Sequence, residues 1–239
     1  MGADSRPFHF KHFSLFHHRS TMKIGTDAIL LAAWIQINTE DSVLDIGTGS
    51  GIISLMLSQR GVKNVDAVEI DYESASEAQS NFEISQWRDS LQLFHADIKD
   101  FASKCVKKYD LIVSNPPFFT STFKTNCLQR NLARHTDTLN FEELIHIAKT
   151  LLTKNGRFAV VLPLFESKQF LEIAAIENFF VKSCMQIFPV AGKEANRTTI
   201  ELVQQPIENP EIIDFTIRNT DRSFTEQYNT FLRDFYLGL

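Results

Sequence analysis

The stretch Ser42-Val-Leu-Asp45-Ile-Gly47-Thr-Gly49-Ser-Gly51-Ile-Ile decides the fold. A short apolar run carries an acid near its end, a turn with three glycines follows, and a helical pattern begins at once. Glycines let the backbone approach a ligand closely and adopt φ values that other residues resist. The stretch therefore predicts a strand over 42–46, a ligand-binding turn and a helix over 51–60.

Short apolar runs alternate with longer amphipathic segments on both sides of this unit, which indicates βαβ units and a parallel sheet. The expected strands are 42–46, 65–70, 91–95, 109–114 and 157–162. The expected helices are 26–37, 51–60, 72–87, 140–153 and 165–177.

The tail has a different pattern. Val181–Phe188 and Thr198–Gln204 read as two strands joined by a polar turn with Gly192, and their short connection favours an antiparallel hairpin. The prediction is an α/β, Rossmann-like class I methyltransferase fold with a seven-stranded, mostly parallel sheet ending in this hairpin. We expect one domain over 1–239: an N-terminal segment and helix (1–37), a core (38–204) and a C-terminal extension (205–239) that includes a closing helix at 224–236.

Composition restricts the function classes. The 239 residues carry a net charge of −5, which counts against a large non-specific contact with phosphates. Basic residues are nevertheless concentrated, without any acid, in two stretches, 5–26 and 124–135. The sequence has no run long enough to span a membrane and no signal-peptide pattern, so we expect a cytoplasmic protein. Its three separated cysteines and its N-terminal histidines form no metal motif, so no metal site is expected.

Three acids follow or end successive predicted strands: Asp45, Glu69 and Asp97. Asp45 suits the cationic ammonium of a methionine moiety and would repel a pyrophosphate. Glu69 lies where it could accept both hydroxyls of a ribose, and Asp97 where an acid often meets the adenine amino group. Ligands of such sheets bind beyond the carboxyl ends of the strands, so the three acids predict a nucleoside cofactor site there.

The predicted strand 109–114 leads directly into Asn115-Pro116-Pro117-Phe118. An exocyclic amino nitrogen is a poor nucleophile, because its lone pair is delocalised into the π system. The Asn115 side-chain oxygen and the Pro116 carbonyl could accept its two hydrogens and hold it in line with a methyl donor. The two prolines stiffen the turn, and Phe118 offers a flat face for a planar substrate.

Several motifs together resemble the tRNA1(Val) (adenine(37)-N6)-methyltransferase family, whose members carry the Asn-Pro-Pro-Phe motif. They are Phe8-His-Phe-Lys-His-Phe13, the segment Met22-Lys-Ile-Gly-Thr-Asp27 with the helix after it, and Arg130-Asn-Leu-Ala-Arg-His-Thr136. His12 departs from the family's usual Gln. The resemblance covers about residues 8–204.

The resemblance implies methyl transfer from S-adenosylmethionine to N6 of adenosine 37, beside the anticodon of a tRNA. It implies a target-base site at Asn115, Pro116, Pro117 and Phe118, and a cofactor site at Asp45, Gly47, Gly49, Gly51, Glu69, Asp97, Thr26 and Asp27. The two basic stretches then become candidates for gripping an anticodon stem-loop, through Lys11, Lys23, Arg130, Arg134 and His135. A monomer is expected.

Three alternatives remain open. Guanine-N2 methylation of ribosomal RNA uses a similar turn, although such proteins often carry a second, degenerate domain. Methylation of a release-factor glutamine uses Asn-Pro-Pro-Tyr, where this chain has Phe118. A cofactor-binding protein that recognises RNA without chemistry would not need Asn115 and Pro116.

Overall fold

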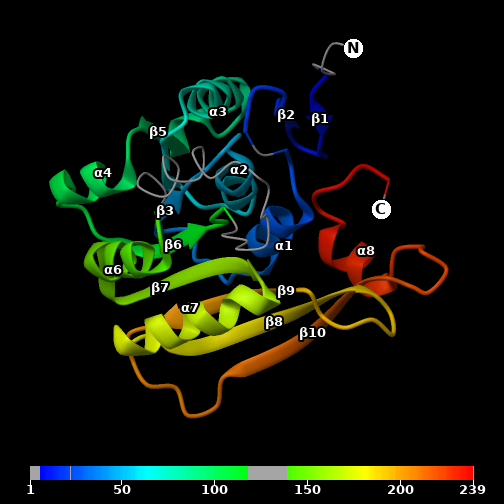
Figure 1. Ribbon diagram of the computed structural model, residues 1–239. Helices are drawn as coiled ribbons and strands as arrows, with labels where there is room; N and C mark the ends of the chain where they lie inside the picture. Colours follow the sequence, from blue (N-terminus) through cyan, green and yellow to red (C-terminus); the bar gives the residue numbers. More distant parts are fainter. Residues whose placement is uncertain (1–5, 22, 118–138, 239) are drawn as a thin grey trace, which may run out of the picture.

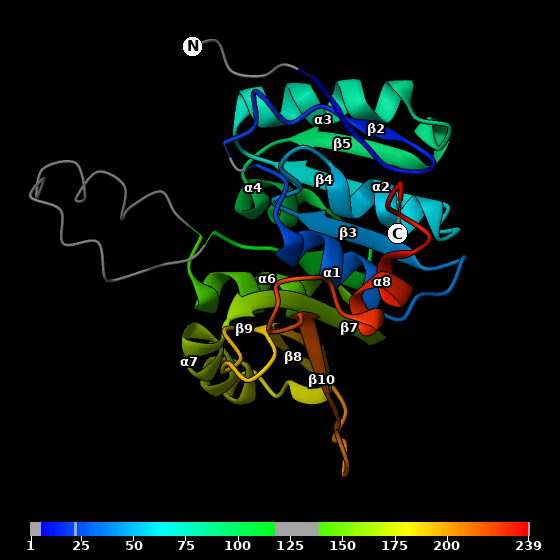
Figure 2. The ribbon, with the colours of Figure 1, turned by 90° about the vertical axis from the view of Figure 1, so that its right-hand side faces the viewer.

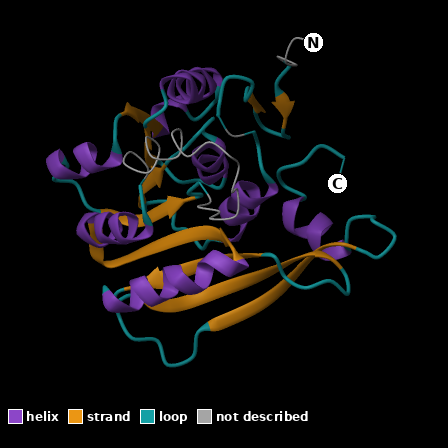
Figure 3. Ribbon diagram, viewed as in Figure 1, coloured by secondary structure: helices purple, strands orange, loops and turns teal. Residues whose placement is uncertain are grey.

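The computed structural model describes residues 6–21, 23–117 and 139–238. Helices cover both faces of a central sheet, which is the doubly wound α/β arrangement that the sequence predicts (Figures 1 and 3). The strands are β1 (Phe8–His9), β2 (Ser14–Leu15), β3 (Ser42–Ile46), β4 (Asn64–Glu69), β5 (Leu91–His95), β6 (Tyr109–Ser114), β7 (Leu152–Pro163), β8 (Phe180–Val190), β9 (Arg197–Val203) and β10 (Glu211–Arg218). The helices are α1 (Thr26–Trp34), α2 (Ile52–Gln59), α3 (Tyr72–Ile84), α4 (Ile98–Lys104), α6 (Phe141–Leu151), α7 (Leu164–Ile176) and α8 (Glu226–Leu232), with a 3-10 turn at Arg88–Ser90.

The main sheet of the described chain has eight strands in the order β10-β8-β9-β7-β6-β3-β4-β5, with β10 toward the bottom and β5 toward the top of Figure 2. Only β9 runs against its neighbours, and the β8–β9 hairpin is antiparallel as predicted. The expected count of seven strands is wrong, because β10 adds to the outer edge of β8 in parallel. This strand belongs to the sheet, although the sequence suggested that the core ended at residue 204.

The order in which strands are added to the sheet reverses at its centre, between β3 and β6. β4 and β5 follow β3 on one side, whereas β6 and β7 lie on the other. Ile46 and Ser114 are partners at the carboxyl ends of β3 and β6, so Gly47 and Asn115 leave the sheet side by side. Doubly wound sheets bind their ligands at such a switch point.

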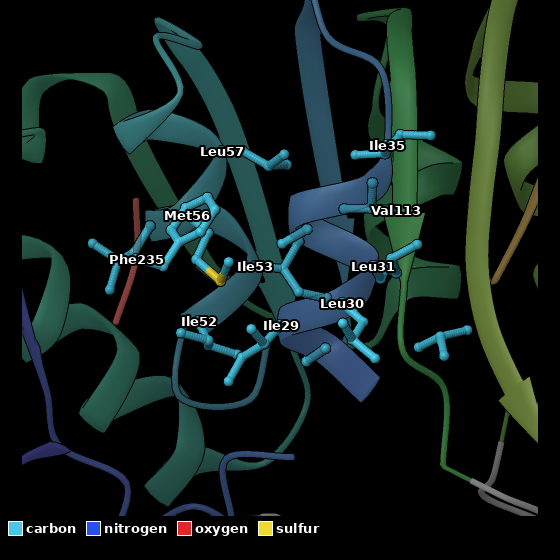
Figure 4. Packing of buried hydrophobic residues seen from close by; sticks show 14 of the residues in the cluster. Ile29, Leu30, Leu31, Ile35, Ile52, Ile53, Met56, Leu57, Val113 and Phe235 are labelled. Atoms are coloured by element: carbon cyan, nitrogen blue, oxygen red, sulfur yellow. The ribbon is translucent and has the colours of Figure 1, made fainter. Parts of the chain in front are cut away.

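Two hydrophobic cores lie on the two faces of the sheet. Along β6, Leu111 and Val113 face one core and Ile112 the other, as the two-residue period of a strand requires. Helices α1, α2, α3 and α8 contribute to the first core, and α4, α6 and α7 to the second. Figure 4 shows α1 and α2 packed together in the first core, with Ile29 beside Ile52 and Ile53.

The two ends of the described chain lie together. β1 and β2 form a short hairpin, Phe10 bridges Tyr236, and the Lys11 N–H donates to the Phe235 carbonyl at 2.8 Å. The Phe10 and Phe13 rings stack with centroids 4.6 Å apart. These contacts hold the start of the first basic stretch against the C-terminal residues 235 and 236.

Candidate functional site

The turn after β3 needs its glycines. Gly47, Gly49 and Gly51 have φ angles of +72°, +59° and +88°, a region that residues with a Cβ adopt at a cost. The Gly47 N–H donates to the Val68 carbonyl at 2.9 Å, and the Gly49 N–H donates to Glu69 Oε2 at 2.8 Å. The turn is therefore fixed to the end of β4, and the glycine requirement that the sequence predicts is confirmed.

Replacing Gly51 with alanine should strongly destabilise the fold. A Cβ at this position would lie 2.4 Å from Cε1 of the buried Phe82 ring, in addition to the positive φ. The φ strain costs about 1–2 kcal/mol and overpacking about 1–3 kcal/mol, so we expect the free energy of unfolding to fall by about 3 kcal/mol. Urea denaturation measures this change in the free energy of unfolding.

Gly192→Ala is the matched control, because Gly192 has a φ of +77° but its added Cβ meets nothing within 4 Å. Its free energy of unfolding should fall only by the φ-strain contribution of about 1–2 kcal/mol. An equal fall in the free energy of unfolding of the two variants would show that the Phe82 ring moves to make room for the new methyl group.

A cavity of about 280 Å³ lies beyond the carboxyl ends of β3, β4, β5 and β6. Its walls come from the glycine turn, the ends of β4 and β5, the start of the Asn-Pro-Pro turn and the segment that precedes α1. It brings together these residues singled out in the sequence: Lys23, Gly47, Gly49, Glu69, Asp97, Asn115 and Pro117. Segments far apart in the chain thus meet at one site, as the sheet topology requires.

Glu69 and Asp97 both line the cavity and both have a second task. Glu69 is 8% exposed, and its Oε1 accepts from the Asp71 N–H at 2.9 Å while Oε2 holds the glycine turn. Asp97 is the N-cap of α4, where its Oδ1 accepts from the Lys99 N–H at 2.8 Å. Each carboxylate is therefore fixed in orientation by the backbone, and their ribose and adenine contacts stay predictions.

Asp45 is fully buried and does not line the cavity. Its Oδ2 accepts from the hydroxyls of Thr48 at 2.6 Å and Ser54 at 2.7 Å, whereas Oδ1 has no partner among the described residues. Burial raises the pKa of Asp45 to about 6, against the lowering effect of the two hydroxyls. Asp45 thus lies behind the cavity wall and is connected to it through Thr48, which lines the cavity.

The two residues expected at the methionine end lie further out. Gly25 lines the cavity, but Thr26 and Asp27 do not. The Asp27 carboxylate instead accepts from Arg197 Nε at 3.0 Å, which connects the first turn of α1 to β9. The sequence pattern could not show this ion pair, because 170 residues separate its members.

The Asn-Pro-Pro turn begins at the cavity. Asn115 is half-buried and lines the wall, and its Oδ1 is a buried acceptor without a partner in the described part of the chain. A buried polar atom without a partner is costly unless a ligand supplies one. Pro116 is buried, Pro117 is exposed on the wall, and Phe118 lies outside the described residues.

Of the five predicted RNA-contacting residues, the structure describes two, Lys11 and Lys23. Lys23 lines the cavity, and its Nζ donates to the carbonyls of His17 and His18 at 3.0 and 3.1 Å. Lys11 lies away from the cavity wall and donates to the carbonyl of Arg233. Arg130, Arg134 and His135 fall outside the described residues.

The sequence reading missed a row of polar residues on α3, namely Ser74, Glu77 and Asn81, all of them buried. Their spacing of three and four residues on one helical face was the available signal. No described helix is long and apolar enough to cross a membrane. Nor do three His, Cys, Asp or Glu side chains gather anywhere in the described ranges in a way that could hold a metal ion.

Comparisons with known proteins show the family to which the chain belongs. The family model "Methyltransferase small domain" matches residues 12–187. The tRNA1(Val) (adenine(37)-N6)-methyltransferase of Proteus mirabilis is 40% identical, over 96% of this chain and 93% of its own. That of Flavobacterium psychrophilum is 41% identical, over 97% and 100%. A predicted O-methyltransferase from Agrobacterium tumefaciens shares the fold, with a TM-score of 0.68 at 16% identity over 87% of this chain and 96% of its own. The chain belongs to the tRNA1(Val) (adenine(37)-N6)-methyltransferase family.

Proposed function

We propose that this protein transfers a methyl group from S-adenosylmethionine to N6 of adenosine 37 in a tRNA for valine. The observation that carries the proposal is the buried Oδ1 of Asn115, which has no partner in the described chain and lies at the cavity wall beside the glycine turn. The eight relatives compared, 35–41% identical, bear the name of this activity. That consistency favours adenine over a guanine of ribosomal RNA or a release-factor glutamine.

The residues around the cavity fit S-adenosylmethionine, which supplies the electrophilic methyl group on a sulfonium. Glu69 would accept the ribose hydroxyls, and Asp97 would accept from the adenine amino group. Gly47 and Gly49 let the backbone approach the cofactor closely. The negative charges of Asp45, Glu69, Asp71 and Asp97 together complement the positive charges of the sulfonium and the ammonium.

The chain's part in the chemistry is to position the target nitrogen. Asn115 Oδ1 and the Pro116 carbonyl accept its two hydrogens, which turns its lone pair toward the methyl group. A turn stiffened by two prolines keeps these acceptors in place, so little order has to be created at the moment of reaction. Methyl transfer leaves a cationic nitrogen that gives up a proton readily, and no strong base is needed. Phe118 is proposed to stack on the adenine.

Cofactor affinity should fall as the pH is lowered through 6. Burial raises the pKa of Asp45 to about 6, so this carboxyl is ionised above that value and neutral below it. Only the ionised form attracts a cationic ligand, and the dissociation constant should therefore rise by up to about tenfold per pH unit below 6. Calorimetric titration of the cofactor between pH 5 and 8 measures the effect.

The Asp45→Asn variant separates Asp45 from the histidines that titrate in the same range. It should bind the cofactor weakly and without the pH dependence of the wild type. If the variant keeps the wild-type dependence on pH, a different group controls it.

The tRNA is proposed to approach the mouth of the cavity. Lys11, Lys23, Arg130, Arg134 and His135 would contact phosphates of the anticodon stem-loop. A loop base is already partly unstacked, so its extrusion into the cavity costs less than flipping a base out of a duplex. We infer that residues 1–239 act as one domain and as a monomer, in the cytoplasm where tRNA is processed.

A substrate panel tests the proposal. The purified protein is incubated with S-adenosylmethionine and, separately, with valine tRNA transcript, ribosomal RNA and a release factor, and the digests are analysed by mass spectrometry. We expect N6-methyladenosine from the tRNA alone. Detection of N2-methylguanosine in RNA would support the same mechanism but contradict adenine as the target. Methylation of the release factor alone would show that the target is a protein amide.

A further inference from the structure

One face of α3 carries a row of buried polar side chains. Ser74, Glu77 and Asn81 are 0%, 2% and 0% exposed. Beyond the first turn of α3, they hydrogen-bond to backbone groups of residues 16–21 and of the glycine turn, and to the Ser20 hydroxyl. Residues 16–21 have no strand partner of their own between β2 and α1, so their N–H groups need these side chains.

Glu77 contacts the middle of this segment. Its Oε1 accepts from the Arg19 N–H at 3.0 Å, and its Oε2 accepts from the Ser20 N–H at 2.9 Å and the Ser20 hydroxyl at 2.5 Å. His18 Nδ1 lies 3.2 Å from Oε1. Burial raises the pKa of Glu77, but these hydrogen bonds outweigh burial and leave the pKa below its usual range. The ionised carboxylate is therefore the form that holds the segment.

Asn81 connects the segment to the glycine turn. Its Oδ1 accepts from the Phe16 N–H at 2.9 Å, and its Nδ2 donates to the Phe16 carbonyl at 2.8 Å and to the Ser50 carbonyl at 2.9 Å. All the hydrogen-bonding capacity of the amide is used except one lone pair. Ser50 lines the cavity, so one buried side chain connects residues 16–21 to the cavity wall.

Ser74 completes the connection at the other end of the row. Its hydroxyl accepts from the Thr21 N–H at 3.2 Å and donates to Asp71 Oδ1 at 2.7 Å. Asp71 and Thr21 both line the cavity, and the Asp71 N–H in turn donates to Glu69. The row is thus connected through Asp71 to Glu69, the carboxylate proposed to bind the ribose.

We propose that Glu77 and Asn81 are positioning residues of the cofactor site. They hold residues 16–21 on α3, and thereby keep the wall formed by Thr21, Lys23, Ile24 and Gly25 ordered before the cofactor arrives. A wall that is already ordered costs no conformational entropy on binding, so the free protein binds its ligand more tightly. The inference rests on the proposed function in that the ligand is S-adenosylmethionine.

Glu77→Gln is the test variant and Glu83→Gln the control. Both lie on α3, but Glu83 is exposed and accepts a hydrogen bond from Gln79 on the same helix. The amide that replaces the Glu77 carboxylate would point N–H hydrogens at backbone donors, so we expect the dissociation constant for S-adenosylmethionine to rise about tenfold or more, and control and wild type to agree. The kcat at saturating cofactor should stay within about twofold, because the reacting groups are untouched. Hydrogen exchange of the amides of residues 16–21 should accelerate in Glu77→Gln only.

A second variant covers the case in which Glu77→Gln fails to fold. Asn81→Asp keeps the shape and the Phe16 N–H acceptor but removes both donations, and it should weaken cofactor binding in the same way. Wild-type affinity and slow exchange at residues 16–21 in a folded variant would overturn the inference and leave the proposed function standing. Absence of cofactor binding by the wild type would overturn the proposed function itself, and this inference with it.

Discussion

Asn115→Ala should abolish methyl transfer while cofactor affinity stays within a few fold of the wild type. Asn115 Oδ1 is a buried acceptor at the cavity wall without a partner in the described chain, and we assign it to a hydrogen of the target amino group. Removing one preorganised polar group from a reacting centre costs about 10²–10³ in kcat. Single-turnover methylation of tRNA, with calorimetric titration of the cofactor alongside, separates the two quantities.

The control for this variant is Asn155→Ala. Asn155 is exposed, and its Oδ1 accepts from Gln205 Nε2 at 2.8 Å, so its loss should leave kcat unchanged. Asn115→Ala that loses cofactor binding together with activity would show that Asn115 holds the structure of the site. A variant with normal kcat would remove Asn115 from the chemistry altogether.

Glu69→Gln should raise the dissociation constant for S-adenosylmethionine about a hundredfold. The carboxylate fixes the Gly49 N–H and the Asp71 N–H, and we propose that it also accepts the ribose hydroxyls. Hydrogen bonds to a charged group contribute about 1.5–3 kcal/mol each, and about 3 kcal/mol corresponds to a factor of about a hundred. Calorimetric titration gives the dissociation constant directly.

Saturating cofactor should restore much of the turnover of Glu69→Gln, because the groups around the target nitrogen remain in place. Glu73→Gln is the matched control, since Glu73 is an exposed residue in the first turn of α3 and its replacement should not change affinity. A Glu69→Gln variant with wild-type affinity would show that this carboxylate serves the glycine turn alone.

Most of the sheet could be predicted from the sequence, because buried parallel strands are short apolar runs between amphipathic helices. The bounds of β3, β5 and β6 are confirmed to the residue. The seven-residue α4 was missed, since its length gives too little periodicity to recognise. β10 was missed for another reason: it is a largely exposed edge strand whose parallel pairing with β8 leaves no local sequence signal.

The candidate site was predictable where it depends on strand ends. Gly47, Glu69, Asp97 and Asn115 all follow or end parallel strands, so the topology brings them together. Contacts made across long separations could not be predicted. Asp27 pairs with Arg197, and Asn81 binds Phe16 at a separation of 65 residues, through side chains whose direction no local pattern fixes.

The most direct test of the central claim is a matched pair of valine tRNA transcripts. One carries adenosine at position 37, and the other carries 2-aminopurine there, which moves the amino group from C6 to C2. Methyl incorporation from S-adenosylmethionine is measured for both, and the product is located by digestion and mass spectrometry. The account predicts N6-methyladenosine at position 37 of the first transcript and no methylation of the second. Equal incorporation into both transcripts would contradict it.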